Sequence, residues 1–399
     1  MIMKDIKTNI PLPEVVWFQE GPGVRNTQYT ISGVKLLNVA NLVDGKIDLS
    51  TSDRYISEEE AYGRYKHFMA DEGDLIIASS GIKVEYIDKK IGFIHKEHLP
   101  LCMNTSTIRF KVIDDKELNI KFFMYFLKSN EFKHQLFRHI TGCAQLNFGP
   151  SHLKKMIISY PPLPEQSRIV EELDLLSNII EKKRQQLSEL DNLAQSIFYD
   201  MFGDPVTNEK GWEVKTFGEE FEISSGGTPD TKNSAYWDNG TISWIGSNLC
   251  QNIVLYNNDC KFITDLGFEK SSTKKYYPGY VLVALVGATI GKVALLKFET
   301  TTNQNVAGIN VPKNESFTSE FVFYLLQQLY CMFEAVGGDK FKMANLKFIR
   351  SLPLILPPFS LQQLFAQKIE AIEKQKALIK KSIAETEELF NSRMDYYFN

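Results

Sequence analysis

Three groups of residues could do chemistry by their type, but none has the spacing that the chemistry needs. The segment Gly287-Ala288-Thr289-Ile290-Gly291-Lys292-Val293 approaches the Walker A loop of nucleotide-binding proteins. It has three residues between its glycines where four are needed, and Val293 replaces the hydroxyl that would hold Mg²⁺. We therefore predict a tight turn between two strands and no nucleotide site.

The other two groups fail in the same way. Tyr160-Pro161-Pro162-Leu163 and Leu356-Pro357-Pro358-Phe359 lack the Asn or Asp with which amino-methyltransferases bind the target amine, so both are interpreted as helix starts. His95, His98 and Cys102 form a loose cluster without a second ligand pair, so no metal site is predicted. All six histidines fall between residues 67 and 152 without a nucleophile motif, and no catalytic residue is predicted.

Nucleic-acid contact has better candidates, in loops at the predicted strand ends. Lysines and hydroxyls can bind phosphate, and Asn and Gln can hydrogen-bond base edges. For any single residue, a surface loop with nothing bound stays an open alternative. The predicted DNA contacts are Ser79, Ser80, Lys83, Lys89, Lys90, Asn104 and Thr105 in the first half, and Thr228, Lys274, Lys275, Thr289, Lys292, Asn303, Gln304 and Asn305 in the second.

Short β-rich runs with turn signals must position these loops. The predicted strands are Val34–Val39, Asp74–Ala78, Val84–Ile87 and Thr107–Val112, followed by Thr241–Ile245, Tyr280–Val286, Lys292–Leu296 and Gly308–Val311. The runs Phe122–Leu127 and Phe321–Leu326 match each other and predict a helix in each half.

The chain is a duplicated module, because residues 161–202 and 357–398 align without a gap at an offset of 196. A 3.5-residue apolar repeat runs through both copies and predicts two long helices that pack along a seam. The seam residues are Ile169, Leu173, Leu176, Ile180, Leu187, Leu190 and Ile197 in the first copy, and Phe365, Ile369, Ile372, Ile379, Ile383 and Phe390 in the second.

Length and composition place the chain among globular proteins. Its 399 residues, 43% of them hydrophobic, are enough for two to three domains. We expect a protein of the cytoplasm, since the first residues lack a secretory apolar core and the longest apolar stretch, Val281 to Ile290, is too short to cross a bilayer. Five cysteines without a CxxC pair predict reduced thiols.

The net charge of −4 neither supports nor excludes DNA binding, because the acidic excess is local. Residues 161–205 carry a net charge of −5, whereas residues 1–160 carry +2. The footprint of a nucleic-acid binder depends on where its charges cluster.

These features together resemble the specificity subunits of type I restriction-modification enzymes, over essentially the whole chain. The family phrases are Pro161 to Gln166, Ile197 to Asp204, Ser225 to Pro229, and Gly287 to Lys292 followed by Asn303-Gln304. The second helix start departs from the pattern, with Ser360-Leu361-Gln362-Gln363, which leaves the helix in place but blurs its cap. The first half lacks the Gly-Gly-Thr-Pro opening.

The resemblance implies an α+β fold with a pseudo-twofold internal repeat, in which two long helices form an antiparallel coiled coil that separates two α/β target-recognition domains. The expected domains are residues 1–160 and 205–356, with long-helix regions at 161–204 and 357–399. It also implies recognition of a bipartite site in double-stranded DNA, and assembly with two methyltransferase subunits and two motor-nuclease subunits. Those partners would use S-adenosylmethionine, ATP and Mg²⁺, while this chain would bind no cofactor and no metal and catalyse nothing itself.

Two other functions stay open at this point. One is a coiled-coil scaffold whose globular domains bind protein partners. The other is a DNA methyltransferase or nuclease in its own right, which the defective motifs disfavour. Neither the bases recognised nor the length of the gap between them follows from the sequence.

Overall fold

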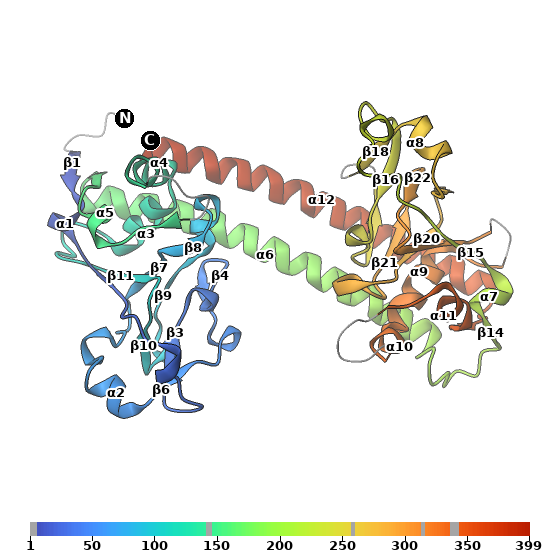
Figure 1. Cartoon of the computed structure of the whole chain (residues 1–399), viewed down its shortest axis with the longest axis horizontal. Coiled ribbons are helices and arrows are strands. Elements are labelled where there is room, and N and C mark those ends of the chain that lie inside the picture. The colour runs from blue at the N-terminus through green and yellow to red at the C-terminus, as the bar shows by residue number, and fades with distance from the viewer. Residues whose placement is uncertain (1–5, 141–145, 257–259, 313–315, 336–342) are drawn as a thin grey trace. The chain divides into compact units, whose positions relative to one another are not determined.

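A computed structural model describes residues 6–140, 146–256, 260–312, 316–335 and 343–399 (Figure 1). The chain divides into two compact units. Unit 1 comprises Met1–Lys182 with Ser382–Asn399, and unit 2 comprises Lys183–Lys381. Each unit therefore contains one globular part and a segment of each long helix.

Unit 1 is built on a four-stranded sheet of order β2-β11-β7-β9 and a three-stranded sheet of order β10-β3-β6. Its strands are β1 (Lys7–Pro11), β2 (Val16–Glu20), β3 (Val34–Leu37), β4 (Leu42–Val43), β5 (Lys46–Ile47), β6 (Tyr55–Ile56), β7 (Leu75–Ala78), β8 (Ser80–Ile82), β9 (Ile91–Phe93), β10 (Leu101–Met103), β11 (Thr107–Val112), β12 (Leu146–Asn147) and β13 (Ile157–Tyr160). Its short helices are α1 (Leu12–Val15), α2 (Glu58–Tyr62), α3 (Ile120–Lys128), α4 (Asn130–His139) and α5 (Pro150–Leu153).

Unit 2 repeats this plan, with sheets of order β15-β23-β20-β21-β17 and β18-β16-β22-β19. Its strands are β14 (Val214–Thr216), β15 (Glu222–Ser225), β16 (Ile242–Ile245), β17 (Ile253–Leu255), β18 (Lys261–Ile263), β19 (Lys275–Tyr276), β20 (Val281–Ala284), β21 (Val293–Leu296), β22 (Thr300–Thr302), β23 (Val306–Asn310) and β24 (Pro353–Ile355). Its helices are α7 (Phe217–Glu220), α8 (Asp265–Glu269), α9 (Ser319–Gln328), α10 (Tyr330–Glu334) and α11 (Leu346–Ser351).

Seven of the eight predicted strands are confirmed, with ends that shift by a few residues, and so are the helices at α3 and α9. The predicted strand Val84–Ile87 is wrong, because this segment is a 3₁₀ helix, Val84–Lys89. The backbone N–H of Tyr86 donates to the carbonyl of Lys83, and that of Lys90 donates to the carbonyl of Ile87. This winding buries Ile87 and leaves Glu85 and Tyr86 exposed, so this short run of β-forming residues is a helical turn.

The two long helices are α6 (Leu163–Phe202) and α12 (Phe359–Phe398). Every predicted seam residue is buried or partly buried, which confirms the heptad pattern. The pattern missed Phe198 and Phe202, which are fully buried one turn apart near the end of α6. Their rings pack on Phe321 and Phe365 with centroids 4.9 to 5.8 Å apart, so the end of α6 is part of the core of unit 2.

The helices run antiparallel in each unit. In unit 1, Arg168 donates to the hydroxyl of Tyr397 at 3.3 Å, and one turn further along α6 the carboxylate of Glu172 pairs with Arg393 at 2.8 Å. In unit 2, Lys376 pairs with Asp191 at 2.7 Å, and Phe198 meets Phe365. Residue numbers that rise along α6 meet falling numbers along α12 in both cases, as expected for an antiparallel pair.

A buried glutamine holds each globular part to the start of its long helix. In unit 1, the side chain of Gln166 donates to the carbonyls of Pro161 and Glu117 and accepts from the backbone N–H of Asn119, all at 2.8 Å. Asn119 is the N-cap of α3. The side chain thus joins the Pro-Pro turn, the loop before α3 and the first turn of α6.

Unit 2 repeats the arrangement at the start of α12, where the sequence departs from the family pattern. Gln362 donates to the carbonyls of Pro357 and Ser316 at 3.0 Å and accepts from the N–H of Thr318, the N-cap of α9, at 3.1 Å. The replacement of Pro by Ser360 therefore leaves both the helix and this hydrogen-bond set intact. We call Gln166 and Gln362 the glutamine clamps.

Because of the clamp, we expect substitutions at the neighbouring residues Gln362 and Gln363 to change stability by very different amounts. Changing Gln362 to Leu should lower the free energy of unfolding by about 3 kcal/mol, because three buried backbone groups lose their partner. Gln363, which is exposed beside it, is the matched control and should tolerate Leu. Denaturant unfolding of both variants measures the difference, and similar stability of the two would contradict a structural role for the clamp.

Candidate nucleic-acid interface

The strand pairing of unit 2 brings most of the predicted contacts to one edge of its sheets. Strand β23 pairs antiparallel with β15 and β20, and β20 pairs antiparallel with β21. The ends of β15 and β20 therefore share an edge with the starts of β21 and β23. Strand β16 runs parallel to β22, and both end at the loop that opens β23. Thr228, Thr289, Lys292, Asn303, Gln304 and Asn305 all lie on loops at this edge.

Thr228 and Gln304 form a direct pair on this edge, since the hydroxyl of Thr228 donates to the side-chain oxygen of Gln304 at 2.7 Å. This bond leaves the amide NH₂ of the exposed Gln304 as the donor that faces solvent. The loops that carry the two residues approach very closely, because a Cβ on Gly226 would lie 2.1 Å from the carbonyl oxygen of Thr302. The indole N–H of Trp244 also donates to the carbonyl of Gly227 at 3.0 Å, so the pair is held by its surroundings.

The residues beside this pair also form hydrogen bonds within the protein. The side-chain oxygen of Asn303 accepts from the backbone N–H of Asn305 at 3.0 Å, which fixes the turn before β23. Lys292 donates to the side-chain oxygen of Gln251 at 3.0 Å. Its pairing with a neutral amide leaves its positive charge uncompensated there. Gln251 was not predicted as a site residue, and no pattern in the sequence connects it with Lys292.

Lys274 and Lys275 lie on or beside β19, and Lys275 pairs with Thr301 of β22, so both lysines lie close to the loop that carries Gln304. Lys274 is exposed, whereas Lys275 forms an ion pair with Glu299 at 2.7 Å. The hydrogen bond to Glu299 raises the pKa of Lys275. Thr289 is partly buried at the end of a 3₁₀ turn, Gly287–Thr289, and its carbonyl accepts from the N–H of Lys292. The glycine–lysine segment is thus the predicted tight turn between β20 and β21.

Unit 1 presents an equivalent edge, but two predicted contacts there are wrong. Ser79 is fully buried, and Asn104 is 2% exposed with its amide donating to the side-chain oxygen of Asn38 at 2.9 Å. Neither side chain can reach DNA, because both lie inside the loops that they shape. Ser80 is partly exposed and Thr105 is exposed, so these two remain available.

Lys90 is also engaged internally, which corrects its predicted role as a DNA contact. Its ammonium donates to the carbonyl of Leu42 at 2.6 Å and to that of Val39 at 3.4 Å. The residue therefore ties β9 to the loop before β4. Lys83 and Lys89, in contrast, have exposed side chains on the 3₁₀ helix that was expected to be a strand.

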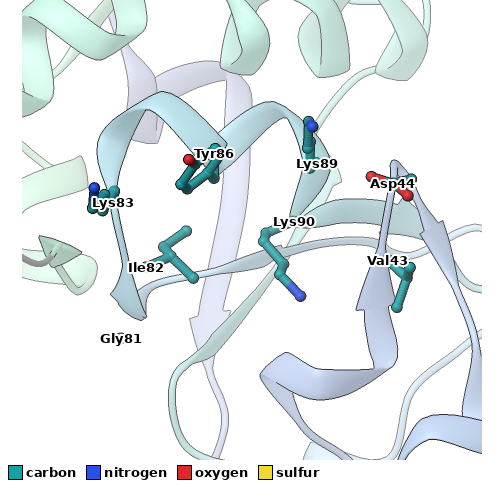
Figure 2. Close-up of a pocket in the computed structure, with 8 residues that line it drawn as sticks. All are labelled: Val43, Asp44, Gly81, Ile82, Lys83, Tyr86, Lys89 and Lys90. Atoms are coloured by element: carbon teal, nitrogen blue, oxygen red, sulfur yellow. The ribbon is translucent and has the colours of Figure 1, made fainter. Parts of the chain in front are cut away.

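These lysines line a groove of about 410 Å³, which Figure 2 shows in close-up. Its walls come from the β4–β5 turn and from residues 81–90, and its lining residues are Val43, Asp44, Gly81, Ile82, Lys83, Tyr86, Lys89 and Lys90. Lys83, Tyr86 and Lys89 recur every three residues, so they share one face of a 3₁₀ helix. Tyr86 was missed as a site residue, although an aromatic residue between two lysines at that spacing was visible in the sequence.

Two exposed lysines beside an exposed tyrosine suit a nucleic-acid backbone better than a neutral ligand. Lys83 also contacts Glu85 at 3.4 Å, but both side chains are more than half exposed, so this pair holds the lysine weakly. The groove and the amide edge give the two units different chemistry. Unit 1 offers mainly cations, and unit 2 offers mainly amides together with Lys292 and the exposed Lys274.

The candidate metal cluster gains no support within the described residues, where no group of three potential metal ligands occurs. His98 accepts through Nδ1 from the backbone of His95, and burial raises the pKa of the Cys102 thiol to about 12. Nor is any helix in this part of the chain long and apolar enough to cross a membrane.

Comparison with known proteins identifies the family. A model described as the type I restriction modification DNA specificity domain matches twice, at residues 32–192 and 209–388. The chain belongs to this family. The specificity subunit is thus the part of a type I restriction-modification system that recognises the DNA target, and its two matches correspond to the internal repeat.

Individual relatives agree. The chain is 26% identical to a Methanocaldococcus jannaschii protein that is provisionally named as the MjaX type I restriction enzyme specificity subunit. The alignment spans 365 residues, which are 86% of this chain and 80% of that protein. It is 25% identical to the MjaIX specificity subunit of the same organism, over 73% of this chain and 72% of that one. The crystal structure of the S subunit from M. genitalium is 15% identical and covers 99% of this chain and 96% of its own, with a TM-score of 0.52, which supports the fold.

The two kinds of polar residue in unit 2 should behave differently toward DNA. Changing Lys292 to Ala should weaken binding to every sequence and reduce the salt slope by about one, because one phosphate contact is lost. Changing Gln304 to Ala should relax one base position in one half-site. Affinity for specific and random duplexes at several salt concentrations separates these outcomes.

Lys297 serves as the control, since it follows β21 at the opposite end of the strand and pairs with Glu320 at 3.1 Å. Its change to Ala should leave both quantities unaltered. An equal effect of Gln304→Ala on specific and random DNA would exclude base recognition by that residue.

Proposed function

We propose that this subunit recognises a bipartite DNA target, with one half-site read by each unit. The observation that carries the proposal is the repetition of one recognition edge. In unit 1 the residue after β7, Ser79, donates its N–H to the carbonyl of Ser106 in the loop before β11. In unit 2 the residue after β20, Leu285, donates likewise to Asn305 before β23. Two equivalent edges with different side chains suit two different half-sites.

The subunit would recognise the DNA sequence, and its partner subunits would catalyse the reactions. We propose that it assembles with two methyltransferase subunits, which methylate adenine with S-adenosylmethionine, and with two motor-nuclease subunits, which translocate and cleave DNA with ATP and Mg²⁺. This assignment rests on the family resemblance, and the absence of a usable catalytic motif in the sequence agrees with it. Because its target is genomic and invading DNA, we place its action in the cytoplasm.

The chief alternative is a coiled-coil scaffold whose globular parts bind protein. The lysine groove favours DNA, because lysine is depleted at the centres of protein interfaces, and the solvent-facing amide of Gln304 is a group that can hydrogen-bond a base edge. A gel-shift experiment with random and cognate duplexes, with and without the methyltransferase subunit, tests the choice. Failure to retain any DNA in either condition would favour the scaffold.

The purified chain alone should transfer no methyl group, cleave no DNA and hydrolyse no ATP. The physical reason is that the glycine–lysine turn lacks the Mg²⁺ hydroxyl and that neither Pro-Pro turn carries the amide or carboxylate that binds a target amine. Assays with S-adenosylmethionine, ATP and Mg²⁺ measure each activity. Turnover that persists through repurification would contradict a purely recognising role.

The long helices should determine the gap between half-sites. Glu172 meets Arg393, so Lys182 and Ile383 stand at the same level of the antiparallel pair. Inserting one heptad after Lys182 and another after Ser382 keeps the seam on its face and lengthens each helix by about 10 Å. We expect unchanged half-sites and a preferred gap that is longer by about one to three base pairs, at 3.4 Å per pair.

Selection from a library of half-sites with variable gaps measures the change. A four-residue insertion at Lys182 alone is the control, because it rotates the apolar stripe away from its partner and should reduce binding. A folded heptad variant that still selects the original gap would contradict the role of the helices as a spacer.

A further inference from the structure

The loop after β16 adds a polar side chain to the edge of unit 2 that carries Gln304, at a position that the sequence did not single out. Strand β16 ends at Ile245 and is followed by a 3₁₀ turn, Ser247–Leu249. Asn248, in the middle of this turn, is exposed. Because β16 runs parallel to β22, the turn lies at the same end of the sheet as Asn303, the first residue after β22.

This turn is fixed to its neighbours on both sides. Before it, the carbonyl of Ile245 accepts from the backbone N–H of Asn303 at 3.1 Å. After it, the N–H of Asn252 donates to the carbonyl of Val293 at 2.8 Å, and the side-chain oxygen of Asn252 accepts from the N–H of Val293 at 3.0 Å. Cys250, between these attachments, is fully buried. The backbone that carries the exposed asparagine is therefore held to the end of β22 and to the start of β21.

The side chain of Asn248 occupies space that a glycine leaves open. A Cβ on Gly246 would lie 2.8 Å from the side-chain oxygen of Asn248 and 3.4 Å from the amide nitrogen of Asn303. Gln251 donates to the backbone carbonyl of Asn248 at 3.1 Å. The side-chain amide of Asn248, in contrast, has no hydrogen-bond partner among the residues of unit 2 that the structure describes, so its donor and its acceptor are both available to a ligand.

Unit 1 builds the equivalent turn without such an amide. A 3₁₀ turn also follows β3, but the third residue after the strand is Ala40, where unit 2 has Asn248. The first residue after the strand is Asn38, where unit 2 has Gly246. Asn38 is buried, and its side-chain oxygen accepts from Asn104 at 2.9 Å. Unit 1 thus uses its amides at this place for internal hydrogen bonds, whereas unit 2 presents one to the solvent.

We propose that Asn248 is a base-reading residue of unit 2 and that the base it reads is an adenine. This inference rests on the proposed function. An asparagine with a free donor and a free acceptor can form two hydrogen bonds with N7 and N6 of adenine in the major groove. A base that is being methylated leaves the stack, so the adenine that Asn248 reads is a different one.

Asn248 and Gln304 should read different bases, although both are amides. The side-chain oxygen of Gln304 already accepts from Thr228 at 2.7 Å, so Gln304 offers only its NH₂ group. A lone donor suits an acceptor on the base edge, such as a purine N7, guanine O6 or thymine O4. The pair of donor and acceptor on Asn248 is the more selective group, because adenine alone presents the complementary pair.

The test is selection of duplexes with random half-sites by the assembled complex of this chain with its methyltransferase subunit, followed by sequencing. The unaltered chain should select adenine at one pair of one half-site. Asn248→Ala should reduce that preference by about tenfold, the effect of one lost bidentate contact, and should leave the other positions unchanged. Asn248→Asp should change the selected base from adenine to cytosine, because a carboxylate accepts from the N4 amino group of cytosine.

Asn239 supplies the matched control, since it is also exposed but precedes β16, at the opposite end of the strand. Asn239→Asp introduces the same negative charge and should leave every base preference unaltered. The melting temperature of each variant should match that of the unaltered chain. If Asn248→Asp binds too weakly for selection because its charge repels phosphate, the result for Asn248→Ala decides.

The possible results separate this assignment from the proposed function. Unchanged selection by Asn248→Ala at every position, or a loss of preference spread over both half-sites, would overturn base reading by Asn248 while recognition by two units stands. Relaxation at a pair other than adenine–thymine would overturn the identity of the base. An unaltered complex that selects no bipartite sequence would overturn the proposed function, and the assignment of Asn248 with it.

Discussion

The buried glutamine at the start of each long helix is the interaction on which the rest of the structure depends. Gln166 and Gln362 are fully buried, and each forms hydrogen bonds with three backbone groups. An amide can do this because its NH₂ group donates two hydrogen bonds and its oxygen accepts in the same rigid plane, so it fixes both the position and the orientation of the helix that carries it. Residues that recognise DNA bind precisely only if the sheet that carries them is held in a fixed position. The glutamine clamp provides this by joining the globular part of each unit to the start of its long helix.

The second constraint is the close approach of the loops at the recognition edge. Gly226 and Gly227 have no space for a Cβ against Thr302 and Ser272, and Gly21 in unit 1 meets the backbone of Asn104 in the same way. Glycine is needed there because backbone packs directly on backbone. The result is that Thr228 and Gln304 are presented from loops with little freedom, which lowers the entropy lost when they bind a base. Unit 1 adds to its glycine contact a buried hydrogen-bond network of Asn38, Asn41 and Asn104.

The sequence predicted correctly those features that produce a periodic pattern or an internal repeat. It did not predict contacts between residues that are distant in the chain. The heptad pattern predicted the seam because burial along a helix recurs every 3.5 residues, and the repeat predicted two units of one topology. The burial of Asn104 was unpredictable, since polar residues are mostly exposed and its partner Asn38 is 66 residues away. Lys90 looked like a free cation for the same reason, because the carbonyls that bind it lie about fifty residues upstream. The strand predicted at Val84–Ile87 was wrong because a run of four residues is too short to distinguish a strand from a 3₁₀ turn.

One polar residue in the seam shows how the two helices avoid slipping. Lys376 occupies an apolar heptad position and is 8% exposed, with its ammonium bound to Asp191 and Glu373 at 2.7 and 2.6 Å. Burial lowers its pKa, but the hydrogen bonds to these carboxylates outweigh that effect and raise it. A shift of one heptad along α6 would leave this ammonium buried without Asp191, at a cost that an apolar residue would not incur. Apolar seam residues tolerate many registers, whereas a buried charge tolerates the one in which its partner is present. Lys376 therefore favours a single register for the helix pair of unit 2, whereas its counterpart in the first copy is the apolar Ile180.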